Sequence, residues 1–96
     1  MGELSGRVAL VTGGGRGIGR STAIALAGAG ADIAICSRTQ AELNEVAGQV
    51  KAAGSDCFTG VVDVTERESV EAFCKGLVEH YSRVDILVNN AGGGLE

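Results

Sequence analysis

The stretch TGGGRGIG, residues 12–19, decides the fold prediction through what lies on either side of it. Before it, residues 8–11 read VALV, a continuous apolar run that is typical of a strand buried on both faces. After it, small and apolar residues recur at helical spacing up to Gly30, namely Ile18, Thr22, Ala25, Leu26 and Ala29. The stretch is therefore predicted to be the turn between a first strand and a first helix.

The same alternation of strand and helix continues to the end of the chain. Apolar runs predict further strands at residues 31–36, 57–62 and 84–88. Thr39 and Thr65 each precede a glutamate by three residues, which predicts a capping box at the start of two more helices. The last helix carries an apolar stripe of Val70, Phe73, Cys74, Leu77, Val78 and Tyr81. The order βαβαβαβ predicts one α/β unit with a parallel sheet between two helical layers.

Composition excludes several classes of protein. The 96 residues suffice for one small domain, and the net charge is −4 with lysines and arginines scattered along the chain, which argues against nucleic-acid binding. No apolar stretch reaches the length of a membrane span, and no export signal is present, so we expect a cytoplasmic protein. Cys36, Cys57 and Cys74 are odd in number and widely spaced, which predicts buried free thiols and no metal site.

The glycines of the first turn predict an anion-binding site. A helix N-terminus presents backbone N–H groups and a favourable dipole to an anion. A side chain at Gly13, Gly17 or Gly19 would block a tight turn, a phosphate, or packing of the helix on the sheet. Residues 14–21 also approach the P-loop pattern, but Arg20 stands where that pattern needs lysine. The pattern that fits is T-G-x-x-x-G-x-G.

With this pattern the chain resembles the short-chain dehydrogenase/reductase family. Three further segments match the family: VDV at residues 62–64, NNAG at residues 89–92, and CSRT at residues 36–39 in place of the acidic residue of NAD-preferring members. The resemblance covers the whole chain and extends to NADP-dependent members such as 3-oxoacyl-ACP reductases. It implies a Rossmann-type three-layer fold with strand order 3-2-1-4, and carbonyl reduction or alcohol oxidation by hydride transfer.

The resemblance and the charge at the end of the second strand together predict NADP(H) as the cofactor. A carboxylate there would repel a ribose 2′-phosphate, whereas Ser37 and Arg38 would favour it by roughly ten- to a hundredfold. Arg16 is a second candidate for that phosphate, and Asp63 matches the family position that binds the adenine amino group. The predicted cofactor-binding residues are Thr12, Gly13, Gly15, Arg16, Gly17, Ile18, Gly19, Ser37, Arg38, Asp63, Val64, Asn90, Ala91 and Gly92.

The family's catalytic residues have no counterpart in these 96 residues. They comprise a tyrosine with a lysine four positions later, a serine and an asparagine. The only tyrosine is Tyr81, which is followed four positions later by Asp85 and is predicted to lie in the core beside a surface residue, His80. We therefore expect residues 1–96 to be the N-terminal, dinucleotide-binding half of a Rossmann domain, without the catalytic half and inactive alone.

The expected strand order also predicts self-association. It makes the fourth strand an edge, and one face of the sheet is covered by the third helix alone, whereas parallel sheets need cover on both faces. A homodimer or higher homo-oligomer through these surfaces is expected. Two alternatives to the cofactor-binding half of an enzyme stay open. One is a nucleotide-binding module without chemistry, and the other is a self-assembling half-domain that binds nucleotide weakly or not at all.

Overall fold

The computed structural model describes residues 2–13, 15, 17–63 and 65–90. Four strands and three helices alternate along the chain: β1 (Val8–Thr12), α1 (Gly17–Gly28), β2 (Asp32–Ser37), α2 (Gln40–Ala52), β3 (Cys57–Val61), α3 (Arg67–Tyr81) and β4 (Ile86–Asn89). All neighbouring strands pair in parallel, in the order β3-β2-β1-β4. The predicted α/β fold and the strand order 3-2-1-4 are confirmed.

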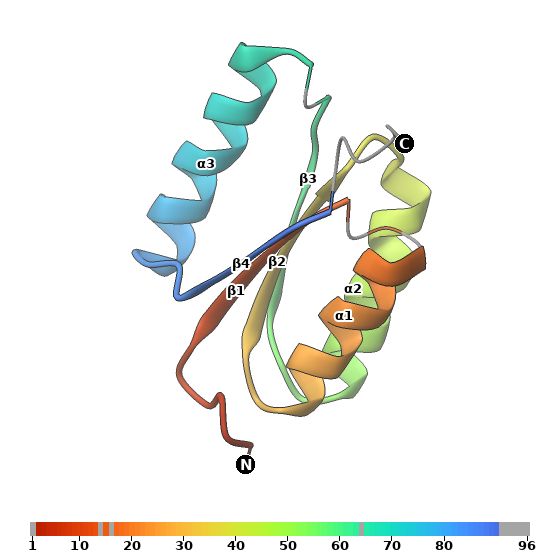
Figure 1. Cartoon of the computed structure of the whole chain (residues 1–96), viewed down its shortest axis with the longest axis vertical. Helices are drawn as coiled ribbons and strands as arrows, with labels where there is room; N and C mark the ends of the chain where they lie inside the picture. The colour runs from red at the N-terminus through yellow and green to blue at the C-terminus, as the bar shows by residue number, and fades with distance from the viewer. Residues whose placement is uncertain (1, 14, 16, 64, 91–96) are drawn as a thin grey trace.

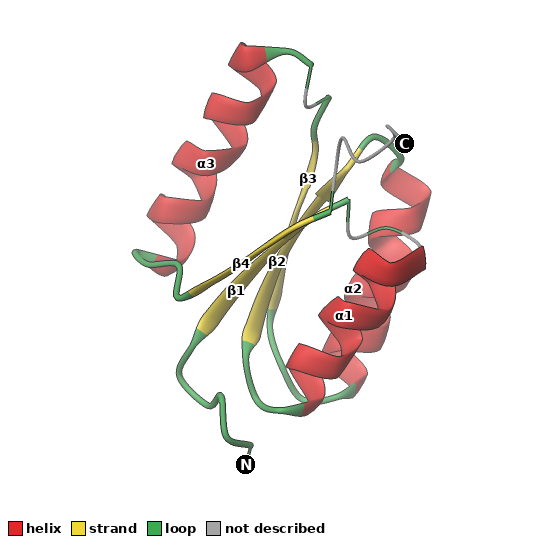
Figure 2. Cartoon of the chain, in the orientation of Figure 1, coloured by secondary structure: helices red, strands yellow, loops and turns green. Residues whose placement is uncertain are grey.

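The sheet lies between two helical layers (Figures 1 and 2). Helices α1 and α2 cover one face and α3 stands on the other. The α1/α2 side holds the larger core, formed by Ala9, Val11, Ala23, Ala27, Ala31, Ile33, Ile35, Leu43, Val46 and Val50. The α3 side holds a smaller core of Ala34, Cys36, Val62, Phe73 and Leu77. Because β1 and β2 are covered on both faces, their sequences are continuous apolar runs.

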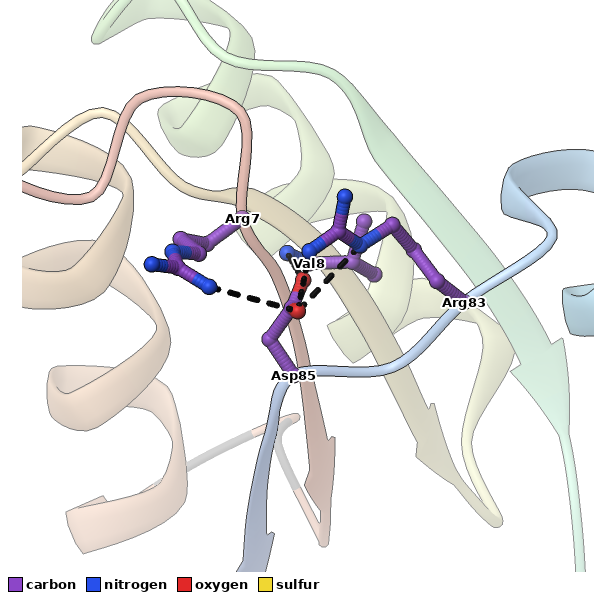
Figure 3. A network of polar contacts seen from close by, with 4 residues as sticks. All are labelled: Arg7, Val8, Arg83 and Asp85. Atoms are coloured by element: carbon purple, nitrogen blue, oxygen red, sulfur yellow. Dashed lines mark hydrogen bonds and ion pairs between the residues drawn. The ribbon is translucent and has the colours of Figure 1, made fainter.

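A network around Asp85 fixes β4 beside β1 (Figure 3). The Val8 N–H donates to Asp85 Oδ2 at 2.8 Å, and the Asp85 N–H donates to the Val8 carbonyl at 2.8 Å. Arg7 and Arg83 both approach Asp85 Oδ1, at 3.7 Å for Arg7 Nη1 and 3.2 Å for Arg83 Nε. The hydrogen bond from Arg83 and that from the Val8 N–H hold the pKa of Asp85 below its ordinary value. Asp85 therefore serves strand pairing.

Both predicted capping boxes are wrong. Thr39 is the N-cap of α2, but its side chain makes no capping hydrogen bond. The N-cap of α3 is Glu66, one residue after the predicted Thr65. The Thr65 hydroxyl instead donates to Asp63 Oδ1 at 2.6 Å. A hydrogen bond to a carboxylate is stronger than one between neutral groups. The Thr65 hydroxyl therefore bonds to Asp63 and does not cap the helix.

The predicted burial of the apolar stripe of α3 is wrong at two residues, Cys74 and Val78. Cys36 is buried and Cys57 is half-buried, but Cys74 is exposed. Val78 and Ile18 are also exposed, at 56% and 77%. Cys74 and Val78 each follow a core residue of α3 by one position, which turns them about 100° away from the sheet. No helix within the described residues has the length and apolarity needed to cross a membrane.

Candidate functional site

The turn after β1 lies where the carboxyl ends of three strands meet. Thr12, the last residue of β1, pairs with Cys36 on β2 and with Asn89 on β4. The Gly13 N–H then donates to the Cys36 carbonyl at 2.9 Å, so the chain turns directly at the sheet edge. Open α/β sheets bind ligands outside the carboxyl ends of their strands. A ligand site is therefore expected at this edge.

Thr12 connects β1 to the end of β4. Its hydroxyl accepts the Asn90 N–H at 2.9 Å and donates to Asn89 Oδ1 at 3.0 Å. These bonds bring the NNAG segment, of which Asn89 and Asn90 are described, against the glycine turn. The threonine before the glycines thus positions two segments that are 76 residues or more apart in sequence.

The glycines of the turn are required for two different reasons. Gly13 and Gly17 have φ angles of +67° and +62°, a left-handed conformation that side chains disfavour. Outside its own helix and its chain neighbours, the described residues place no atom within 4 Å of the position that a Cβ would take at Gly17. At Gly19, by contrast, a Cβ would overlap the Gly13 carbonyl oxygen and lie 2.8 Å from Asn90 Nδ2. Gly19 is therefore needed for close packing, and Gly17 for its backbone conformation.

Asp63 lies after β3 and is held by the residue two positions later. The Thr65 N–H donates to Asp63 Oδ1 at 2.9 Å, and the Asp63 N–H donates to Ser69 Oγ at 3.1 Å. The hydrogen bonds from the Thr65 hydroxyl and N–H lower the pKa of Asp63, and the charge of Arg38 adds a smaller effect. Asp63 is therefore an ionised, oriented carboxylate with Arg38 within electrostatic reach.

The structure brings most of the predicted site residues to one edge. Thr12, Gly13, Gly19 and Asn90 form one group of contacts, and Gly15 packs beside Ser37. Ile18 lies on the first turn of α1 and is exposed. Arg16, Val64, Ala91 and Gly92 lie outside the described residues.

Glu42 also lies at this edge, although no sequence pattern indicated it. A Cβ at Gly15 would lie 2.9 Å from Glu42 Oε1, so this carboxylate packs against the glycine turn. The sequence singled out Glu42 only as a partner of Thr39 in a capping box. The signal that could have found it is its place in the first turn of the helix that follows β2, because that turn lies at the same edge as the glycines.

Tyr81 lies at the opposite, amino edge of the sheet. Its hydroxyl donates to Asp56 Oδ2 at 2.8 Å, immediately before β3 begins, and His80 Nε2 lies 3.1 Å from the same oxygen. Burial raises the pKa of the Tyr81 phenol, and the bond to Asp56 raises it further. Asp56 is thus the carboxylate that acts on Tyr81. A phenol this hard to ionise is unsuited to acid–base chemistry near neutral pH.

The carboxyl edge of the sheet has features that suit an anion, and the described part of the chain contains no cluster of metal-ligating side chains. No group of three or more His, Cys, Asp or Glu side chains within that part could hold a metal ion. The edge combines a glycine turn at a helix N-terminus, an oriented carboxylate at Asp63 and an exposed cation at Arg38. This combination suits a ligand that carries both phosphate groups and hydrogen-bond donors.

Comparison with known proteins identifies the family. The family model described as short chain dehydrogenase matches residues 7–96. An uncharacterized oxidoreductase of Mycobacterium tuberculosis is 44% identical over 93 residues, which cover 97% of this chain and 35% of that protein. The chain thus spans about a third of that relative's length.

Two solved structures have the same fold over nearly the whole chain. NAD⁺-bound xylitol dehydrogenase superposes with a TM-score of 0.91 at 36% identity, covering 94% of this chain and 35% of that one. A metagenomic short-chain oxidoreductase in complex with NADP superposes with a TM-score of 0.88 at 38% identity, covering 93% of this chain and 40% of that one. With the match of the family model, these findings show that the chain belongs to the short-chain dehydrogenase family.

Proposed function

We propose that residues 1–96 form the dinucleotide-binding half of a Rossmann domain in an oxidoreductase. The enzyme would transfer hydride between a nicotinamide dinucleotide and an alcohol or carbonyl carbon. The observation that carries this proposal is the glycine turn at the start of α1. Gly13 and Gly17 adopt left-handed conformations there, and no other element of the described part of the chain packs where a Gly17 side chain would lie. A pyrophosphate can approach backbone N–H groups at such a place. The similar structures contain NAD⁺ in one case and NADP in the other.

The remaining roles follow from the positions of the side chains at the same edge. Asp63 is ionised and fixed by Thr65, so it is suited to accept a hydrogen bond from the adenine amino group. Asn90 packs beside Gly19, and in this proposal it would border the bound dinucleotide. The other proposed binding residues are Thr12, Gly13, Gly15, Arg16, Gly17, Ile18, Ser37, Arg38, Val64, Ala91 and Gly92.

Within this function, NADP(H) is the proposed cofactor. Ser37 ends β2, where a ribose 2′-substituent would lie, and Arg38 follows it as an exposed cation. A guanidinium binds a phosphate through two parallel charge-assisted hydrogen bonds, which a ribose hydroxyl cannot match. The preference for NADP(H) over NAD(H) is expected to be roughly ten- to a hundredfold.

Isothermal titration of the intact protein with NADPH and with NADH tests the cofactor preference. Arg38→Ala should remove most of the preference while leaving NADH binding nearly unchanged, because NADH has no phosphate for the guanidinium. Arg67→Ala is the matched control, since Arg67 is an exposed arginine at the start of α3. Equal affinities of the unchanged protein for both nucleotides would contradict the assignment.

These 96 residues are proposed to bind the cofactor without performing the reaction. The only tyrosine donates its hydroxyl to Asp56 at the edge opposite the glycine turn, and this supports a structural role for it.

The free thiols of Cys36, Cys57 and Cys74 support a reducing, cytoplasmic setting. Association of the chain with itself through β4 and the adjoining sheet face is also proposed. The 63% exposure of Leu87 on β4 supports that association.

A further inference from the structure

The side chain of Glu42 converges with Ser37 on Gly15. A Cβ at Gly15 would lie 2.9 Å from Glu42 Oε1 and 3.0 Å from Ser37 Oγ, so both oxygens lie within 3.0 Å of one point. Gly15 itself is buried, and Glu42 is half-buried in the first turn of α2. The closeness of the glycine turn to α2 therefore depends on the absence of a side chain at position 15.

Ser37 ties this point to the end of β2. Its hydroxyl accepts the Thr39 N–H at 3.2 Å, which fixes the hydroxyl between β2 and the start of α2. Ser37 is one of the two residues that would receive a ribose 2′-substituent in the proposed function. The Glu42 carboxylate consequently lies beside the place where the nucleotides NADP(H) and NAD(H) differ.

We propose that Glu42 is a specificity-determining residue that reduces the preference for NADP(H) over NAD(H). The inference rests on the proposed function, because it needs a dinucleotide at this edge. A carboxylate repels a 2′-phosphate but accepts a hydrogen bond from a ribose 2′-hydroxyl. Ser37 and Arg38 thus favour the phosphorylated cofactor while Glu42 opposes it. NAD-preferring members carry an acidic residue at the end of β2, and this chain does not. Glu42, from α2, brings a carboxylate close to the same place and so partly replaces that charge.

Substitution of Glu42 separates this role from a structural one. In Glu42→Gln the side chain keeps its shape and loses its charge. The ratio of the NADPH to the NADH association constant is expected to rise about three- to tenfold, as Coulomb repulsion across several ångströms of partly solvated space predicts. Glu42→Lys should raise the ratio further. Both effects should shrink in high salt.

Glu45→Gln provides the control. Glu45 lies on the same helix, its side chain is 60% exposed, and it pairs with Arg20 at 3.4 Å. Removal of its charge changes the net charge equally and should alter the ratio less than twofold. Titration of the intact protein gives both association constants for each variant.

The outcomes distinguish this inference from the proposed function. The role of Glu42 would be overturned if Glu42→Gln weakened the binding of both nucleotides by the same factor. It would also be overturned if the ratio of the NADPH to the NADH association constant stayed the same or fell. A parent protein that favours NADH would overturn the cofactor assignment, yet a rise in the ratio on Glu42→Gln would still support the role of Glu42. A parent that binds neither nucleotide would overturn both.

Discussion

Gly19 and Gly48 both lie inside helices, but a methyl group would meet different surroundings at the two positions. Gly19 faces the Gly13 carbonyl oxygen and the Asn90 side-chain nitrogen, whereas a Cβ at Gly48 would meet no other element of the described chain within 4 Å. Gly19 therefore contributes to tertiary packing, and Gly48 only adds conformational freedom to the unfolded chain. The two glycines form a matched pair for mutagenesis.

Gly19→Ala is expected to destabilise the fold by about 1–3 kcal/mol, because the turn must move to admit the methyl group. Gly48→Ala should stabilise it by about 0.5–1 kcal/mol, since alanine is the better helix former. Urea unfolding at constant m-value measures both differences. A Gly19→Ala protein as stable as the parent would show that the turn leaves room for a methyl group at this position.

Sequence predicted the residue types of the site better than their contacts. The spacing of Gly13, Gly17 and Gly19 indicated a turn without side chains, and the positive φ angles of Gly13 and Gly17 agree with it. The contact of Gly19 with Asn90 and the approach of Glu42 to Gly15 join segments distant in sequence. Such contacts depend on how far each helix lies from the sheet edge, which periodicity does not specify.

Among the elements, α3 is fastened at its end by a cluster around Asp56. Asp56 Oδ2 receives the Tyr81 hydroxyl, and His80 Nε2 lies beside it. The His80 ring stacks on Phe58 with centroids 5.1 Å apart. The hydrogen bonds from His80 and then Tyr81 lower the pKa of Asp56. The cluster thus joins the last turn of α3 to the start of β3.

Acid should loosen this attachment. Because the pKa of Asp56 is lower in the folded than in the unfolded chain, its contribution is present above the unfolded value of about 4 and is lost as pH falls through the folded value. Asp56→Asn should therefore flatten the acid limb of the stability–pH curve. The side chain is 51% exposed, so the difference at pH 6 should not exceed about 1 kcal/mol.

Urea unfolding at a series of pH values measures this effect. Glu79→Gln changes the same charge near the end of the same helix and should leave the shape of the curve intact. An Asp56→Asn protein with an unaltered acid limb would show that the cluster does not hold the helix.

Element order was predictable because alternating apolar runs and helical stripes leave few topologies for a parallel sheet. Element ends were less so: β4 begins at Ile86, two residues after the predicted start, and α3 is capped at Glu66 instead of Thr65. The Thr65 hydroxyl could either cap the helix or donate to Asp63, and it donates to Asp63. The sequence does not indicate which of these two hydrogen bonds is the more stable. The Asp56 cluster joins residues 24 or more apart, so no local pattern announces it.

At the scale of the whole molecule, the two faces of the sheet are unequally covered within the described residues (Figure 2). The α1/α2 face holds Ile86 and Val88 of β4 against its core. On the other face α3 packs through Phe73 and Leu77, and Leu87 of β4 stays 63% exposed. An edge strand with an exposed leucine offers both backbone groups and apolar surface to a second copy.

The 96-residue chain is therefore expected to associate in a concentration-dependent manner, and sedimentation velocity across micromolar concentrations measures this. Burial of a leucine is worth about 1.5–3 kcal/mol, so loss of Leu87 from both copies of a dimer should weaken association by about a hundredfold or more. Leu87→Lys should accordingly shift the chain to monomer.

Val61→Lys is the control, because it places the same charge on β3, at the opposite edge of the sheet. Val61 is 52% exposed there, and the substitution should leave association unchanged. A compact monomer of the parent chain at all concentrations would contradict association through β4. Equal weakening by both substitutions would instead attribute it to net charge, since the two variants share that change and differ only in which edge they alter.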